Sequence, residues 1–162
     1  MTTKSMFSDE EWGQLLQAPF AAGMYIIIAD PSFVVGSMKE AFALSSGILK
    51  KARDNNSELL SSLLADLQHT ETIKQAQIKF EQKDIAAMKS KITGSLDEAV
   101  RLLDQKATPE ECVEIKSWLY DLSVKTANAA KEGGFLGFGG TRVTESEATA
   151  LKEISGHLGL VA

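Results

Sequence analysis

The sequence predicts a single all-α domain over residues 1–162, a bundle of six or seven helices. Three observations carry this prediction: helix-start signals recur along the chain, apolar residues follow a three-and-four spacing, and no segment shows a clear strand pattern. The chain of 162 residues is long enough for one hydrophobic core, and its 44% hydrophobic and 24% charged residues are average for a globular protein.

The helix-start signal is a Ser or Thr followed three residues later by Glu. The hydroxyl accepts a hydrogen bond from the backbone N–H three residues on, and the carboxylate accepts one from the N–H of the first residue. One match means little, but several that each precede apolar residues at helical spacing reinforce one another. The pairs are Ser8/Glu11, Ser37/Glu40, Ser95/Glu98, Thr108/Glu111 and Thr144/Glu147, with Asn55/Glu58 as a weaker relative.

Apolar spacing supports the same fold class. The leucines of residues 59–67 recur at intervals of three and four, and Ile85 and Met88 begin a second stripe of this kind. Gly94 stands directly before Ser95, which predicts that one helix ends and the next begins there.

The nearest approach to a strand is residues 72–80, but their spacing fits a helix equally well, so no sheet is expected. The predicted helices span residues 8–30, with a break at Pro19 left open, 37–53, 55–68, 71–93, 95–106, 108–131 and 144–159. Grouped by position, these form a tail (1–7), a first hairpin (8–53), bridging helices (54–107) and a second hairpin (108–162).

Charge and cysteine content restrict the function. The net charge of −5 disfavours nucleic acid as a partner, because nucleic-acid affinity depends largely on lysine and arginine. The single cysteine, Cys112, permits no internal disulfide and suits a reducing compartment.

No secretory signal is visible at the start, and the uncharged stretch 12–29 is interrupted by glycine, glutamine and proline, which favours a buried helix over a membrane span. The expected location is the cytoplasm.

The two predicted hairpins share a short pattern. Residues 37–44 and 144–151 both read [ST]-x-x-E-A-x-A-L, and each follows a longer helix with its own capped start. A duplication of this kind would let two helical hairpins pack by pseudo-twofold symmetry.

The same hairpins resemble a known family. Ala29-Asp30, the segment Glu147–Leu151 and the terminal Leu158-Gly159-Leu160 are similar to motifs of the TerB-like family associated with tellurite resistance. The resemblance covers only part of the chain, and Pro31 stands where the family has glycine. It implies a helical fold and a divalent metal site whose ligands would be Asp30, Glu40, Glu132 and Glu147. Taken by itself, Asp30 could instead cap the backbone amides that follow it.

The most unusual segment is the glycine-rich loop of residues 132–141. Five of its ten residues are glycine, and it carries Phe135, Leu136 and Phe138. It lacks the Lys-Ser/Thr sequence of a phosphate-binding loop. Turned inward, the apolar side chains would plug one end of the bundle, and turned outward they would bind a protein partner.

The sequence around the remaining candidate functional residues favours structural roles for them. Cys112 is expected to be buried, His157 is expected to pair with Glu153 one turn earlier, and His69 is expected to be exposed at a helix junction. No arrangement of these groups indicates a catalytic site or a cofactor.

We therefore predict a non-catalytic protein-interaction or stress-associated binding module, not an enzyme, with Phe135, Leu136 and Phe138 contacting an unidentified protein partner. The alternative is a TerB-like domain that binds a divalent metal ion. A homodimer is also predicted, because residues 12–49 carry only three charged side chains and could expose more apolar surface than one chain can bury.

Overall fold

The computed structural model describes residues 1–30, 56–81, 84–132 and 145–160, with the side chains of 129–132 left out. Within these ranges the chain forms α-helices and one short 3-10 turn, without a strand, which confirms the predicted all-α helical bundle. The elements are η1 (Lys4–Met6), α1 (Asp9–Ala29), α3 (Glu58–Asp66), α4 (Thr70–Ala76), α5 (Ile85–Lys106), α6 (Pro109–Glu132) and α7 (Glu145–His157).

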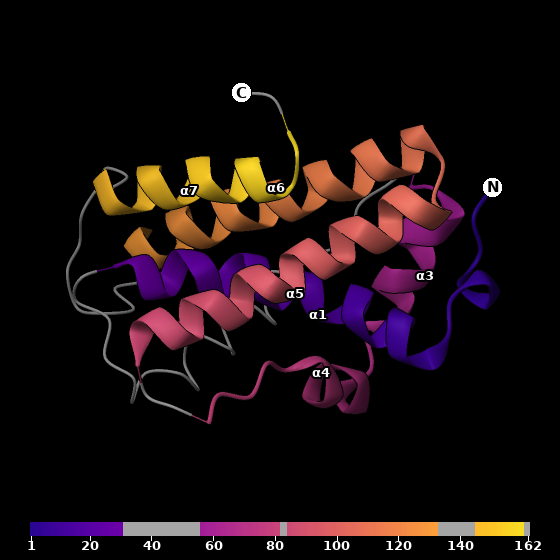
Figure 1. Ribbon diagram of the computed structural model, residues 1–162, viewed down its shortest axis with the longest axis horizontal. Coiled ribbons are helices and arrows are strands. Elements are labelled where there is room, and N and C mark those ends of the chain that lie inside the picture. Colours follow the sequence, from indigo (N-terminus) through magenta and orange to yellow (C-terminus); the bar gives the residue numbers. More distant parts are fainter. Residues whose placement is uncertain (31–55, 82–83, 133–144, 161–162) are drawn as a thin grey trace.

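Helix α1 lies at the centre and contacts α4, α5, α6 and α7. Figure 1 shows α5 in front of it, α6 and α7 above it and α4 below it. Burial on nearly every side explains why residues 12–28 carry no charge, since an unpaired charge there would be costly. None of the described helices combines the length and apolar character needed to cross a bilayer.

The start of α1 follows the sequence prediction. The Ser8 hydroxyl accepts a bond from the Glu11 backbone N–H at 3.1 Å, and the Glu11 carboxylate accepts one from the Ser8 N–H at 2.8 Å. The break considered at Pro19 does not occur, because α1 continues through it. Its neighbours Ala18 and Phe20 are buried at 2% and 0% exposure, and this packing holds the helix together where one backbone hydrogen bond is missing.

The predicted helices 71–93 and 95–106 are wrong in their boundaries. The first part is a short helix, α4, which ends at Ala76, and the described residues that follow it, 77–81, form no helix. Among them Ile78 is 5% exposed. Residues 77–81 are therefore held by burial of an apolar side chain rather than by helical hydrogen bonds.

Helix α5 then runs unbroken through Gly94. It starts at Asp84, whose carboxylate accepts a bond from the Ala87 N–H at 3.1 Å, so the true cap is an aspartate outside the Ser/Thr-and-Glu pattern. The predicted helix boundary at Gly94 and the cap pair Ser95/Glu98 are wrong.

Burial explains why the local signal at Gly94 fails. Ile92 and Leu96 are both fully buried on one face of α5, so the apolar stripe continues across the glycine. Ser95 is also buried, and its hydroxyl donates a bond to the Gln17 side chain of α1 at 3.0 Å. The serine thus joins two helices instead of starting one.

The first seven residues, expected as a tail, pack on the bundle. Thr108 and Glu111 form the predicted reciprocal pair at the start of α6, with bonds of 3.3 and 2.9 Å. The other Glu111 carboxylate oxygen accepts a bond from the Thr2 N–H at 3.0 Å. Thr2 and Phe7 are buried at 2% and 8% exposure. One glutamate therefore caps a helix and holds the N-terminal segment.

Helix α3 begins later than predicted. Ser57 is its cap, with a hydroxyl that accepts a bond from the Leu60 N–H at 3.2 Å, whereas Asn55 of the pair Asn55/Glu58 lies outside the described residues. The predicted leucine stripe is confirmed, because Leu59, Leu60 and Leu63 are almost fully buried.

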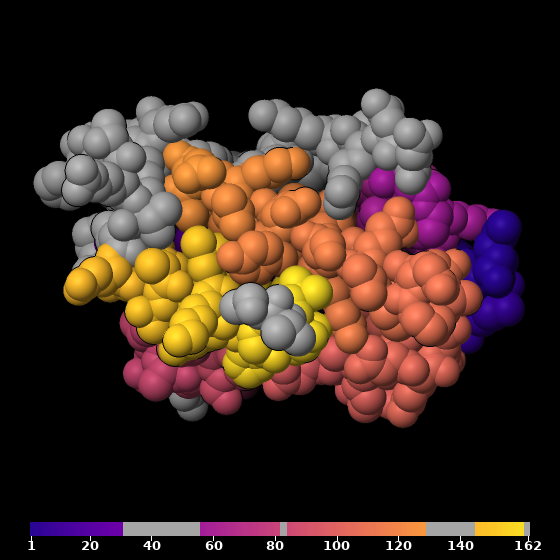
Figure 2. Space-filling model, turned by 90° about the horizontal axis from the view of Figure 1, so that it is seen from above, coloured from indigo at the N-terminus to yellow at the C-terminus, as the bar shows by residue number. Residues whose placement is uncertain are grey.

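Helix α7 lies along α6 (Figure 2) and ends in a glycine cap. Gly159 has a φ of 69°, its N–H bonds the Gly156 carbonyl at 3.1 Å, and the Leu160 N–H bonds the Ser155 carbonyl at 3.0 Å. These bonds satisfy carbonyls that the helix end leaves without partners. The terminal Leu-Gly-Leu therefore has a structural role here.

The proposed internal repeat stays a prediction. Residues 37–53, Thr144 and the cap pair Ser37/Glu40 lie outside the described residues.

Candidate functional site

The segment 70–81, which contains α4 and the residues after it, borders two open hollows. We call them the Trp12 hollow and the Phe80 hollow. The Trp12 hollow has a volume of about 250 Å³ and the Phe80 hollow about 230 Å³. The first is lined by Lys4, Asp9, Trp12, Gly13, Leu16, Asp66, Thr72, Gln75 and Ala76. The second is lined by Phe80, Glu81, Ala87, Met88 and Lys91.

A charged and aromatic group of three side chains forms one wall of the Trp12 hollow. The Trp12 indole N–H donates a bond to Asp66 Oδ2 at 2.8 Å, and the Lys4 ammonium lies 2.6 Å from the same oxygen. The ammonium also lies 5.4 Å from the centre of the indole ring. The three residues come from η1, α1 and α3, so the arrangement depends on the packing of distant parts of the chain.

The contacts of Asp66 keep it ionised. Partial burial raises the pKa of its carboxyl group, but the hydrogen bonds from Lys4 and Trp12 outweigh burial and leave the pKa below its usual value. Within the described part of the chain, both bonds use Oδ2, and Oδ1 has no hydrogen-bond partner.

Other polar side chains of the Trp12 hollow are open to a ligand. Among the described residues, the side chains of Asp9, Thr72 and Gln75 have no hydrogen-bond or ion-pair partner. Leu16 and Ala76 supply buried apolar surface beside them, at 8% and 5% exposure. The Trp12 hollow thus combines several polar and charged side chains with a small apolar wall.

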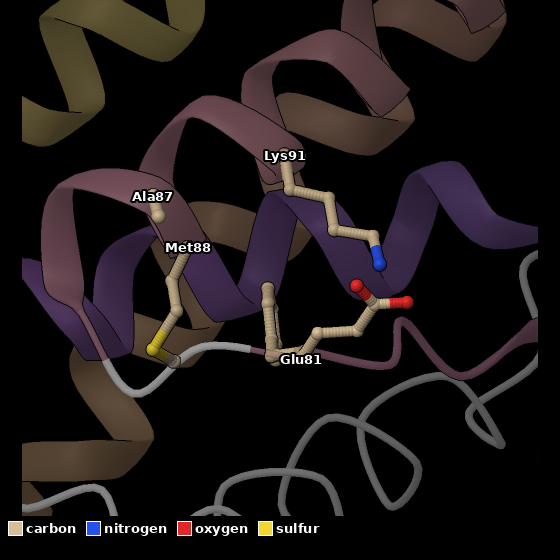
Figure 3. A pocket seen from close by; sticks show the side chains of 5 residues that line it. Glu81, Ala87, Met88 and Lys91 are labelled. Atoms are coloured by element: carbon tan, nitrogen blue, oxygen red, sulfur yellow. The ribbon is translucent and has the colours of Figure 1, made fainter.

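The Phe80 hollow combines similar side chains. Lys91 reaches across it with its ammonium near the Glu81 carboxylate, and Met88 and Ala87 lie along the helix that forms its wall (Figure 3). The Lys91 ammonium bonds the backbone carbonyl of Lys79 and lies 6.0 Å from the centre of the Phe80 ring. Each hollow thus has a lysine placed over an aromatic ring.

A separate polar cluster connects α1, α5 and α7. The Tyr25 hydroxyl donates a bond to the Glu153 carboxylate, Lys89 lies 3.1 Å from the same carboxylate, and its ammonium is 5.2 Å from the centre of the tyrosine ring. Burial and the Glu153 bond raise the pKa of Tyr25, whereas the bond from Tyr25, together with Lys89, lowers the pKa of Glu153. A tyrosine that is harder to deprotonate is suited to holding α7 in place, not to acting as a base.

His157 pairs with a different residue from the one predicted. Its Nδ1 lies 2.7 Å from the Asp97 carboxylate of α5, while Glu153 is engaged with Tyr25 and Lys89. The spacing of four residues on α7 indicated a shared face, but contacts between helices determine the actual partners.

The other single candidates lie as the sequence indicates. Cys112 is buried and its thiol bonds the Leu103 carbonyl at 3.1 Å, and burial raises the pKa of the thiol. His69 is exposed at the start of α4. Cys112 is therefore a structural residue.

The predicted metal ligands are only partly described. Asp30 directly follows α1, Glu147 is buried in the first turn of α7, Glu132 ends α6 without a described side chain, and Glu40 lies outside the described residues. In the part of the chain that the structure describes, no three His, Cys, Asp or Glu side chains lie close enough together to hold a metal ion. The four-ligand site stays a prediction.

The predicted partner-binding residues Phe135, Leu136 and Phe138 also lie outside the described residues. The residues of the Trp12 hollow were not predicted from the sequence. Asp66 is far from Lys4 and Trp12 in the chain, and the one available signal was that a tryptophan directly follows three acidic residues at a helix start.

Comparisons with protein-family models, with curated proteins and with solved structures find no match to this chain.

Proposed function

We propose that this protein is a non-catalytic binding module and that it recognises a protein partner through the surface around the segment 70–81. We call this surface the α4 face. The observation that supports the proposal is the pair of hollows that border this segment, each with a lysine over an aromatic ring.

The chemistry of the α4 face fits recognition. Phe80 is a partly exposed aromatic residue, and the largely buried side chains of Trp12, Leu16 and Met88 form the floors of the hollows beside charged lining residues. Interfaces are enriched in aromatic residues and methionine at their centres, with polar groups around them.

The test compares three full-length baits immobilised at equal density: wild type, Thr72→Arg with Gln75→Arg, and Val113→Arg. The double variant places two large cations at the Trp12 hollow, whereas Val113 is 60% exposed on α6 and serves as the control. Quantitative mass spectrometry should find proteins that wild type and Val113→Arg enrich equally and the double variant loses. Equal enrichment by all three baits would exclude the α4 face as the recognition surface.

The glycine-rich loop remains a second proposed contact for the same partner. Phe135→Ser with Phe138→Ser should reduce capture if the aromatic side chains face outward, and circular dichroism would check that helicity is kept. Unchanged capture would remove the loop from the proposal.

We also propose a cytoplasmic location, a homodimer and no nucleic-acid partner, as the composition suggests. The part of residues 12–49 that the structure describes is mostly buried within one chain, so the dimer proposal rests on the remainder. Light scattering over a range of concentrations would test it, and a constant monomer mass would contradict it.

A further inference from the structure

We propose that the Trp12 hollow binds a primary alkylammonium group, and that Lys4 occupies the position of this group in the free protein. The inference rests on the binding function proposed above and specifies the ligand class of one of its hollows.

The wall of the hollow has the features of an ammonium site. The face of a tryptophan ring attracts a cation, and a carboxylate held by a second donor gives a charge-assisted hydrogen bond. Lys4 makes both contacts, with its ammonium 2.6 Å from Asp66 Oδ2 and 5.4 Å from the centre of the Trp12 ring. The chain's own lysine therefore shows which chemical group this wall accepts.

Lys4 is placed so that it can be exchanged. Its side chain is 53% exposed, and the N-terminal segment is fixed on either side of it by buried Thr2 and buried Phe7. Half-exposed ion pairs contribute little to stability, so Lys4 can leave Asp66 without releasing the segment.

The space beside Lys4 fits the rest of a ligand. The hollow continues from Asp66 past the open side chains of Asp9, Thr72 and Gln75, with Leu16 as apolar wall. Its two carboxylates and one lysine give a formal charge of 1 − 2 = −1, which favours a cation over an anion. An alkyl chain can lie on Leu16 while its ammonium replaces that of Lys4.

Tryptophan fluorescence of the full chain gives the test. The chain has two tryptophans, so Trp118→Phe leaves Trp12 as the reporter. Titration with n-butylammonium chloride, against sodium chloride at equal ionic strength, should give a saturable change. Asp66→Asn should abolish it, because the amide can still accept the Trp12 bond but carries no charge. Lys4→Met should tighten binding by about threefold or more, because the competing lysine is gone.

These variants separate the proposal from ordinary misfolding. A general loss of structure would weaken butylammonium binding in both Asp66→Asn and Lys4→Met. The proposal instead requires that Asp66→Asn abolishes binding and that Lys4→Met tightens it. The absence of a saturable change in the Trp118→Phe protein, or binding in Lys4→Met that is equal to or weaker than in that protein, would overturn it.

Gly13 offers a matched pair of variants. A Cβ added at Gly13 or at Gly94 would meet no atom within 4 Å, and both glycines lie inside helices, so alanine should raise the melting temperature in each case. Only Gly13 lines the Trp12 hollow. Gly13→Ala should weaken butylammonium binding while Gly94→Ala leaves it unchanged. Equal affinities in the two variants would contradict binding in this hollow.

Two sources of the ammonium group are distinguished by a peptide. If acetyl-Gly-Lys-Gly-amide binds more tightly than butylammonium, the group is a lysine side chain of a partner, and if it binds more weakly, the group belongs to a small free amine. The same peptide with acetylated lysine must not bind, and equal binding of that peptide would overturn the proposal.

The ammonium titration and the partner-capture experiment can fail separately. Ammonium binding without a captured partner would reject the proposed function and keep this inference. If the Thr72→Arg with Gln75→Arg variant loses a captured partner but the protein does not bind butylammonium, the proposed function is kept and this inference is rejected.

Discussion

The four long helices and the α4 segment show two ways in which this chain specifies structure. In α1, α5, α6 and α7, a continuous buried stripe determines where each helix lies, even across Pro19 and Gly94. Among the described residues 70–81, the only regular element is a seven-residue helix, and two hollows with polar side chains border this segment. Burial of apolar surface is thus the main source of stability in the bundle, while the α4 segment borders two hollows lined in part by polar and charged side chains.

This difference teaches where substitutions should affect stability and where they should affect binding. A residue in the stripe has many neighbours that cannot readjust, because helix packing is dense. A residue at a hollow has open space on one side. Stability effects should therefore be largest in the stripe and decrease toward the surface pairs.

The largest effect is expected in the centre of the bundle. Phe20 is fully buried in α1, and Phe20→Ala should lower the free energy of unfolding by about 3–5 kcal/mol, through lost burial and the cavity left behind. Urea denaturation followed by circular dichroism measures this change. Val113→Ala is the control, since Val113 is 60% exposed and should change stability by less than about 0.5 kcal/mol. Comparable losses in both variants would contradict the central position of α1.

The next effect concerns Glu111, which joins the start of α6 to the N-terminal segment. Glu111→Gln should lower stability at neutral pH by about 1–3 kcal/mol, because hydrogen bonds to a buried carboxylate are weakened. Partial burial raises the pKa of Glu111, but bonds from Thr2 and Thr108 outweigh it, so the pKa in the folded chain lies below 4.5.

A group with a lowered folded pKa stabilises the fold above its ordinary value and loses this contribution as pH falls through the folded pKa. Wild type and Glu111→Gln should therefore differ at neutral pH and converge in acid. Urea denaturation over a range of pH would show this, and a difference that stays constant into acid would contradict the role of the carboxylate.

A smaller effect of opposite sign is expected at Gly94. Because α5 passes through it as regular helix with room for a side chain, Gly94→Ala should raise stability by about 1 kcal/mol. Gly159→Ala is the counterpart, since the φ of 69° at the end of α7 disfavours any side chain and should lower stability. Thermal unfolding would measure both. Destabilisation by Gly94→Ala would instead support a helix end at that position.

Gly94 also shows how far the sequence predicts this fold. Local signals predicted the all-α class, the buried α1 and the caps at Ser8 and Thr108, because these depend on residues three or four apart. They failed at Gly94, where burial of a stripe on both sides outweighs a glycine and a serine.

Such local signals could not predict the Trp12 hollow. Lys4 and Asp66 are separated by 62 residues and meet only because η1 and α3 pack at the same end of α1. Contacts of this range depend on the assembled bundle, and neither periodicity nor a local motif encodes them.

The smallest effect is expected at the surface pair His157 and Asp97, which joins the end of α7 to α5. The two atoms are 2.7 Å apart, but the side chains are 33% and 57% exposed, so solvent screens the pair. A double-mutant cycle with His157→Ala and Asp97→Ala should give a coupling energy below about 1 kcal/mol. High salt should reduce it. A coupling that is independent of salt would mean that packing, not charge, holds this end of α7.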